Sequence, residues 1–113
     1  MPETIRIDTD GRGVATLWLA RPDKHNALSA QMIDELTEAA GRLGADTGVR
    51  AVILAAEGKS FCAGGDLAWM QEQMTADAAT RSAGAQALAG MLNALNELPK
   101  PLIGRVHGNA FGG

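Results

Sequence analysis

The stretch FCAGGDLAWM, Phe61 to Met70, decides the fold because its character changes halfway along. It closely follows the apolar run RAVILAA, Arg50 to Ala56, which lacks alternation and predicts a strand covered on both faces. Two glycines and Asp66 come next, and a Trp-Met pair follows. Because an aspartate can cap free backbone N–H groups, the stretch predicts a glycine turn and then a short helix through about Met74.

The same order returns near the end of the sequence. PLIGRV, Pro101 to Val106, predicts another buried, central strand, and HGNAFGG, His107 to Gly113, places small residues directly after it. Two strands that each lead into a glycine-bearing turn suggest that the two turns share one task.

The remaining segments place these turns in an α/β framework. TIRID, Thr4 to Asp8, and VATLWL, Val14 to Leu19, flank the turn sequence DGRG and predict a hairpin. A helix is expected after Ser29, which can cap it, and Gly44 with the ADTG segment is expected to end it. A longer helix is expected over Asp77 to Leu98, before Pro99. The apolar stripes on these two helices are Met32, Ile33, Leu36, Ala39, Ala40 and Leu43 on the first, and Leu88, Met91, Leu92, Leu95 and Leu98 on the second.

Composition excludes several classes of protein. The 113 residues are 46% hydrophobic and 20% charged, which suits one globular domain, and the formal net charge of −3 argues against a general binder of nucleic acid or anionic membrane. No apolar run approaches the roughly 20 residues of a membrane span, and the polar N-terminus does not resemble a signal peptide. Cys62 is the single cysteine, so a reducing cytoplasm is the default location. His25 and His107 stand far apart, which makes a metal site unexpected.

The glycine turns have two interpretations on spacing alone. Glycine is common where a strand ends, so both can be ordinary turns. Alternatively, the N–H groups of Gly65 and Gly113 form a two-donor cradle for an oxygen that gains negative charge. Nucleotide-binding motifs fail by position, because a P-loop ending in Gly58-Lys59-Ser60 needs a glycine where Ile53 stands.

Three ordered motifs carry a resemblance to a known family. RPDKHNALS resembles the early R-P-x-x-x-N-A-L segment of the enoyl-CoA hydratase/isomerase (crotonase) family. FCAGGDL is similar to its [FS]-x-[AS]-G-[AG]-D-[LI] turn, and PKPLIGRVHGNAFGG to its K-P-x-I-A-x-V-x-G-x-A-x-G-G segment. Together they span nearly the whole chain, which makes the match specific.

The resemblance implies an α/β fold, a crotonase-type ββα spiral core that is incomplete here, with residues 1–113 as the N-terminal part of a single domain. It also implies an acyl-CoA thioester as substrate, whose carbonyl oxygen would accept the N–H groups of Gly65 and Gly113. Coenzyme A is then part of the substrate, and no separate cofactor is expected. Residues matching the acyl-CoA channel are Ala63, Asp66 and Leu67. Residues matching the loop at the nucleotide and pantetheine portion are Lys24, His25 and Ala27, and Arg21 is a further cation that can face the phosphates.

Hydration of an enoyl thioester also needs a base and an acid, which are glutamates in the hydratases of this family. The first follows the second glycine turn, so neither position lies within residues 1–113. We therefore expect an N-terminal fragment, inactive alone, of a lyase or isomerase of fatty acid metabolism. The full-length parent would hydrate a 2-enoyl-CoA and form a trimer or hexamer. The alternative is a non-catalytic acyl-CoA-binding or assembly module that another chain completes.

Four further side chains have a structural interpretation beside a functional one. Cys62 is expected to pack, since no base is identifiable beside it. Trp69 and Met70 can shape an acyl pocket, but a buried Trp more often serves the core. Asp66 is expected to cap its helix and thereby fix Gly65 in place.

Overall fold

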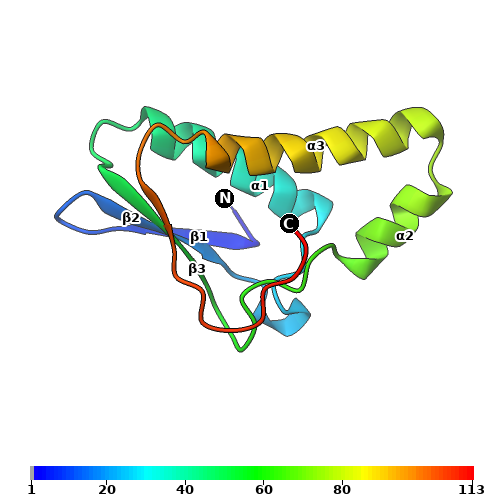
Figure 1. Ribbon diagram of the computed structural model, residues 1–113, viewed down its shortest axis with the longest axis horizontal. Helices are drawn as coiled ribbons and strands as arrows, with labels where there is room; N and C mark the ends of the chain where they lie inside the picture. The colour runs from blue at the N-terminus through cyan, green and yellow to red at the C-terminus, as the bar shows by residue number, and fades with distance from the viewer. Residues whose placement is uncertain (1) are drawn as a thin grey trace.

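The computed structural model describes residues 2–113 as a four-stranded sheet with two long helices on one face. The order along the chain is β1 (Ile5–Thr9), β2 (Val14–Leu19), the 3-10 turn η1 (Pro22–Lys24), α1 (Ala30–Ala45), β3 (Ala51–Ala56), α2 (Leu67–Thr75), α3 (Ala78–Asn96) and β4 (Leu102–Gly104). Figure 1 shows α1 and α3 above the sheet, with α2 at the far end of α3.

The sheet has the order β1-β2-β3-β4 and mixes two kinds of pairing. The predicted hairpin is confirmed: β1 and β2 are antiparallel, with Ile5 opposite Leu19. β2 and β3 are parallel, as are β3 and β4. The carboxyl ends of β2, β3 and β4 therefore meet at one edge of the sheet, and the segments that leave these strands start together.

The core lies between the sheet and the two long helices. Leu17 of β2 and Val52 of β3 are fully buried there, against Met32 and Leu36 of α1 and Met91 of α3. All six residues of the predicted α1 stripe are buried. Of the α3 stripe, Met91 is buried, and Leu88, Leu92, Leu95 and Leu98 pack against the core while half-buried.

The caps predicted from sequence are confirmed. The Ser29 hydroxyl accepts a hydrogen bond from Met32 N at 3.2 Å, and the Asp66 carboxylate accepts one from Trp69 N at 3.0 Å. At the start of α3, Asp77 was predicted as the first helical residue but is the cap instead, because its carboxylate accepts a hydrogen bond from Thr80 N. α1 continues through Gly44 to Ala45, so the glycine does not itself stop the helix.

The predictions of buried strands need correction. β4 has three residues and pairs only with β3 within residues 2–113, and its Ile103 is 55% exposed. Ile53 of β3 is half-buried, because α1 and α3 cover the opposite face of the sheet. On the outer face Trp18 lies between the guanidinium groups of Arg6 and Arg105, 4.8 and 5.0 Å from its ring centre. An apolar run identifies a strand, but what covers it depends on packing.

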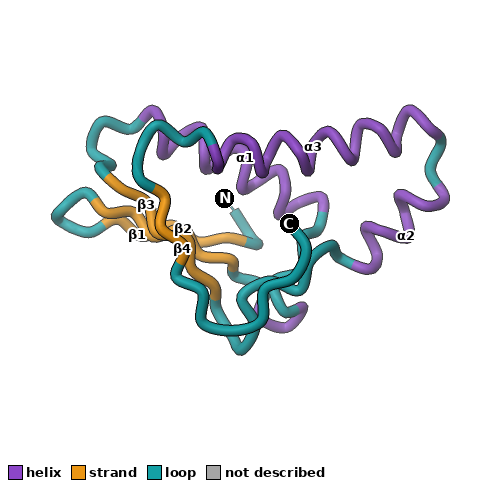
Figure 2. Tube along the Cα trace, viewed as in Figure 1, coloured by secondary structure: helices purple, strands orange, loops and turns teal. Residues whose placement is uncertain are grey.

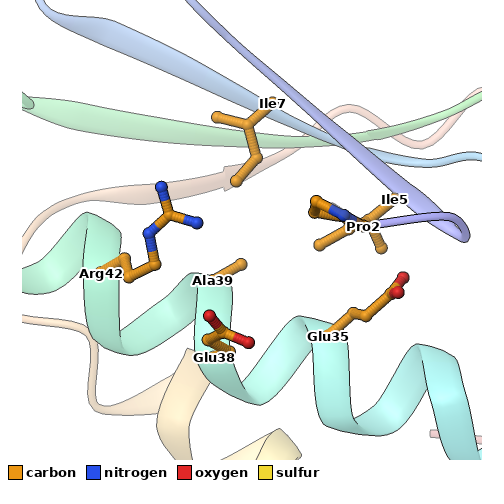
Figure 3. Close-up of a pocket in the computed structure, with 7 residues that line it drawn as sticks. All are labelled: Pro2, Ile5, Ile7, Glu35, Glu38, Ala39 and Arg42. Atoms are coloured by element: carbon orange, nitrogen blue, oxygen red, sulfur yellow. The ribbon is translucent and has the colours of Figure 1, made fainter.

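A small cavity of about 230 Å³ opens between the hairpin and α1. Figure 3 shows Pro2, Ile5 and Ile7 on the hairpin side and Glu35 and Arg42 on the helix side. The Glu35 carboxylate accepts the N–H groups of Glu3 and Thr4, which ties the start of β1 to α1. This cavity is separate from the glycine turns. Among residues 2–113, no helix combines the length and hydropathy required to cross a bilayer.

Candidate functional site at the carboxyl ends of the parallel strands

Three chain segments run side by side beyond the ends of β2, β3 and β4. Leu28 forms a parallel bridge with Gly65, and Cys62 forms one with Ala110. The segment 61–66 therefore lies between 25–28 and 109–111, as strand order requires. Figure 2 shows these loops gathered below the sheet. The two glycine turns, separated by more than forty residues in the sequence, are neighbours in space.

The two turns touch through their backbones. Phe111 N donates to Cys62 O at 2.9 Å, and a Cβ added to Gly112 would lie 3.2 Å from Gly64 Cα. Gly64 has a φ of +93°, a conformation that side chains disfavour. Gly108 is required for a different reason, since a Cβ there would come within 2.3 Å of Lys59 O. Small residues at these positions let the two segments pack together directly.

Hydrogen bonds to Leu28 fix the orientation of the Gly64–Gly65 peptide. Leu28 N donates to Gly64 O at 2.7 Å, and Asp66 N donates to Leu28 O at 2.9 Å. In a planar trans peptide the N–H points opposite to the C=O. The Gly65 N–H therefore points away from Leu28, toward the side on which residues 109–112 run. Within residues 2–113 it donates to no protein acceptor.

A cavity of about 800 Å³ opens beside this peptide. It brings together seven of the eight residues predicted for the site: Lys24, His25, Ala27, Ala63, Gly65, Asp66 and Leu67. Gly64, Met70 and Gly112 line it as well. Lys24, His25 and Leu67 are exposed, whereas Ala27 is buried. The cavity thus brings together the charged side chains of Asp23, Lys24 and Asp66, an apolar wall and a backbone amide.

Gly113, the eighth predicted residue, lies at a second and smaller cavity of about 70 Å³. Its walls are apolar, with Leu28, Phe61 and Leu92 among them. Leu28 and Leu92 also stand closest to a Cβ added at Gly113. The first cavity ends at Gly112 and the second at Gly113, so adjacent residues of one turn reach both spaces.

Arg21 and Asp66 form the most enclosed ion pair at the site. Arg21 Nη2 donates to Asp66 Oδ2 at 3.2 Å, and the two side chains are 17% and 13% exposed. The hydrogen bond from Trp69 N is the main cause that lowers the pKa of Asp66 below its ordinary value, and Arg21 adds to it while burial opposes both. Arg21 Nη1 also donates to Ala27 O at 2.6 Å. The guanidinium therefore hydrogen-bonds to protein groups, Ala27 O and the Asp66 carboxylate, and does not face the cavity rim as the sequence suggested.

Asn26 is a structural element of the site that residue patterns did not reveal. It is fully buried with a φ of +57°. Its Oδ1 accepts from Arg21 N at 2.8 Å, and its Nδ2 donates to Glu57 O and Ser60 O at 2.8 and 3.0 Å. One side chain thus joins the loop after β2 to the turn after β3. The motif contained this residue, but its spacing gave no sign of burial.

The other candidate side chains contact neighbouring protein groups, and two of them, His25 and Met70, also line the cavity. Cys62 is buried and its Sγ lies 3.3 Å from Asn26 O, consistent with a packing role. His25 Nδ1 lies 3.1 Å from Ser60 Oγ, and His107 Nε2 lies 2.7 Å from Gly58 O. No group of three or more metal-ligating side chains gathers among residues 2–113. Trp69 is half-buried against the core, while Met70 lies at the cavity.

Comparison with known proteins confirms the family that the motifs suggest. The family model for enoyl-CoA hydratase/isomerase matches residues 9–113. The chain belongs to this family. It is 36% identical over 104 residues to the probable enoyl-CoA hydratase echA6 of Mycobacterium tuberculosis, covering 92% of this chain and 39% of that protein. A 4-chlorobenzoyl coenzyme A dehalogenase-2 of an Arthrobacter species is 37% identical over 106 residues, covering 89% and 37%.

Solved structures confirm a crotonase-type fold. An enoyl-CoA hydratase from Shewanella pealeana superimposes with a TM-score of 0.94 at 37% identity, over 98% of this chain and 42% of that one. An enoyl-CoA hydratase from Mycobacterium smegmatis gives a TM-score of 0.85 at 42% identity, over 94% and 40%. The chain thus spans about two fifths of the length of these relatives, and its sheet and helices form part of their domain.

Proposed function

We propose that this part of the protein binds a coenzyme A thioester and polarises its carbonyl group with the backbone amides of Gly65 and Gly113. The observation that carries the proposal is the direction of the Gly65 N–H. It points toward the second glycine turn, beside a cavity that both turns line. Preorganised donors of this kind stabilise the negative charge that develops on a thioester oxygen as an enolate forms.

The walls of the larger cavity suit the other parts of such a ligand. Lys24 and His25 are exposed in its lining, beside Asp23. The Lys24 ammonium can meet the phosphates of coenzyme A at little desolvation cost, and the His25 ring can hydrogen-bond to them. Ala63 and Leu67 offer small and apolar surface near the amide. Asp66 lines the cavity as well, but its carboxylate is occupied by Arg21 and Trp69 N. Its part in binding is therefore to shape the wall and hold the turn.

For the whole protein we propose hydration of a 2-enoyl-CoA, in which this segment supplies binding and carbonyl polarisation. The family resemblance puts the glutamates that act as base and acid after the second glycine turn, outside residues 1–113. Isomerisation or another thioester reaction is the alternative, as the dehalogenase among the relatives illustrates. A homotrimer or hexamer in the cytoplasm remains the proposed setting.

Titration of the chain with crotonyl-CoA and with free coenzyme A tests this function. Free coenzyme A lacks the thioester carbonyl group. Tighter binding of crotonyl-CoA is therefore expected if an amide pair meets the thioester oxygen. Equal affinities, or no binding of either compound, would contradict the proposal. Size-exclusion chromatography in the same samples tests the assembly module, for which a stable oligomer is expected to appear with ligand.

A further inference from the structure

A continuous run of hydrogen bonds leads from the guanidinium group of Arg21 to the Gly65 amide. Arg21 Nη1 donates to Ala27 O at 2.6 Å. The N–H of that same peptide group belongs to Leu28, and it donates to Gly64 O at 2.7 Å. The N–H of the Gly64–Gly65 peptide is the donor proposed above to meet the thioester oxygen. Two peptide groups in series thus separate a positive charge from this donor.

We propose that Arg21 is a positioning residue for the Gly65 amide, which it orients and polarises through the Ala27–Leu28 peptide. This inference rests on the proposed function of Gly65. A cation that hydrogen-bonds a carbonyl oxygen draws electron density from the attached N–H, and bonds in such a chain strengthen one another by about 10–30% each. The Gly65 N–H then becomes a better donor in the direction that the peptide plane already fixes.

The second contact of the guanidinium makes the arrangement rigid. Arg21 Nη2 donates to the Asp66 carboxylate, which caps α2 through Trp69 N. One planar guanidinium group therefore binds both Ala27, just before Leu28, and Asp66, just after Gly65. A fork of fixed geometry reaches two acceptors at once, whereas a lysine ammonium is a compact point charge on a flexible stem. The Arg21 side chain is 17% exposed, which limits competition from water for both contacts.

The test compares a thioester with its thioether. Butanoyl-CoA has a carbonyl oxygen, and S-butyl-CoA carries a methylene group in its place, so the ratio of their affinities reports on contact with that oxygen. We expect the Arg21→Lys variant to lower this ratio about fivefold, the scale of one weakened hydrogen bond, with the thioether affinity unchanged. Arg12→Lys is the matched control, since Arg12 is 80% exposed and, within residues 2–113, its guanidinium pairs only with Asp10.

The outcomes separate the two proposals. A wild-type ratio near one, or no binding of either ligand, contradicts the function proposed for Gly65. A wild-type preference for the thioester that Arg21→Lys retains in full overturns the role of Arg21. A loss of both affinities together also overturns it, because that pattern reports a general structural defect.

A measurement on the ligand-free chain covers the case in which the variant does not fold. The ¹⁵N shift of Gly65 depends on the bond accepted by Gly64 O, and a through-bond coupling between Leu28 N and the Gly64 carbonyl carbon reports that bond directly. We expect the coupling in the wild type, and a change of the Gly65 shift in Arg21→Lys but not in Arg12→Lys. An absent coupling, or an unmoved Gly65 signal in a folded Arg21→Lys chain, overturns the inference.

Discussion

The two halves of the molecule differ sharply in how they pack. The hairpin, α1 and β3, with the residues up to Cys62, supply nearly all of the buried apolar side chains. Among residues 2–113, Met91 is the one buried apolar residue that comes from beyond Cys62. α2 contains no buried residue, and its Leu67 and Met74 are 75% and 76% exposed.

The glycine turns lie where these halves meet. The packed half holds the Gly65 peptide through Leu28 and Arg21, so the proposed donor has a fixed direction. The loosely packed half adds Leu67 and Met70 to the cavity wall, where a ligand can be accommodated by small movements. The hydrogen bonds that orient the Gly65 amide therefore come from the well-packed half, and the exposed apolar part of the cavity wall comes from the other half.

A substitution that creates a cavity in the well-packed half should give the largest loss of stability. Leu36 is 2% exposed, so Leu36→Ala is expected to lower the free energy of unfolding by about 2–5 kcal/mol. Met74→Ala on α2 is the control and should change it by less than about 0.5 kcal/mol. Urea unfolding followed by circular dichroism measures both. Similar losses in the two variants would remove the contrast between the halves.

Removing the proposed donor should have the largest effect on function. Gly65→Pro deletes the N–H, and in the full-length protein we expect turnover to fall about 10²–10³-fold, the usual result of losing one oxyanion donor. Gly65→Ala is the matched control, because it keeps the N–H. Its Cβ would lie nearest the flexible Met70 side chain, with Sδ at 3.2 Å, and in ordinary contact with Trp69 Cε3 at 3.8 Å. Steady-state kinetics should show the alanine variant close to the wild type. Near-normal turnover in the proline variant would contradict the role of Gly65.

The charge of Asp66 should stabilise its contacts with Arg21 and Trp69 N in a pH-dependent way. Because the folded state lowers the pKa of this carboxyl group, its contribution is present above the unfolded pKa near 4 and is lost as the pH falls through the folded value. Asp66→Asn keeps a capping side chain, so at pH 7 we expect a loss of about 1 kcal/mol that shrinks below pH 4. Thermal unfolding across pH 2–7 measures this, with Asp34→Asn on the exposed face of α1 as control. A difference that stays constant down to pH 2 would exclude a contribution from the ionised carboxylate.

Substitution of Cys62 should have the smallest effect. The thiol is buried and meets protein groups only, so Cys62→Ala should cost about 1 kcal/mol of stability through lost packing. The affinity of the Cys62→Ala variant for crotonyl-CoA should stay within about twofold of the wild type. A selective loss of thioester binding, with stability intact, would assign the thiol a part in the site.

Short-range chemistry accounts for most of what the sequence predicted correctly. Ser29 and Asp66 form caps with N–H groups three residues away, and the α1 stripe follows directly from helical spacing. The hairpin follows from the strand pattern on each side of the DGRG turn. The motifs placed seven of eight candidate residues at one cavity without showing what each does there.

Residue patterns alone therefore predicted the main helices and strands, their order, the caps at Ser29 and Asp66, and the family. The three-dimensional packing was needed to show that β4 pairs only with β3 within residues 2–113, that Asn26 is buried, and that Arg21 turns inward to Ala27 and Asp66. The two groups of features differ in the sequence separation of the interactions that produce them. Caps and periodicity act within a few residues, whereas the direction of the Gly65 amide is set by a peptide nearly forty positions away, and a charged side chain chooses its partner only after packing has brought the candidates together.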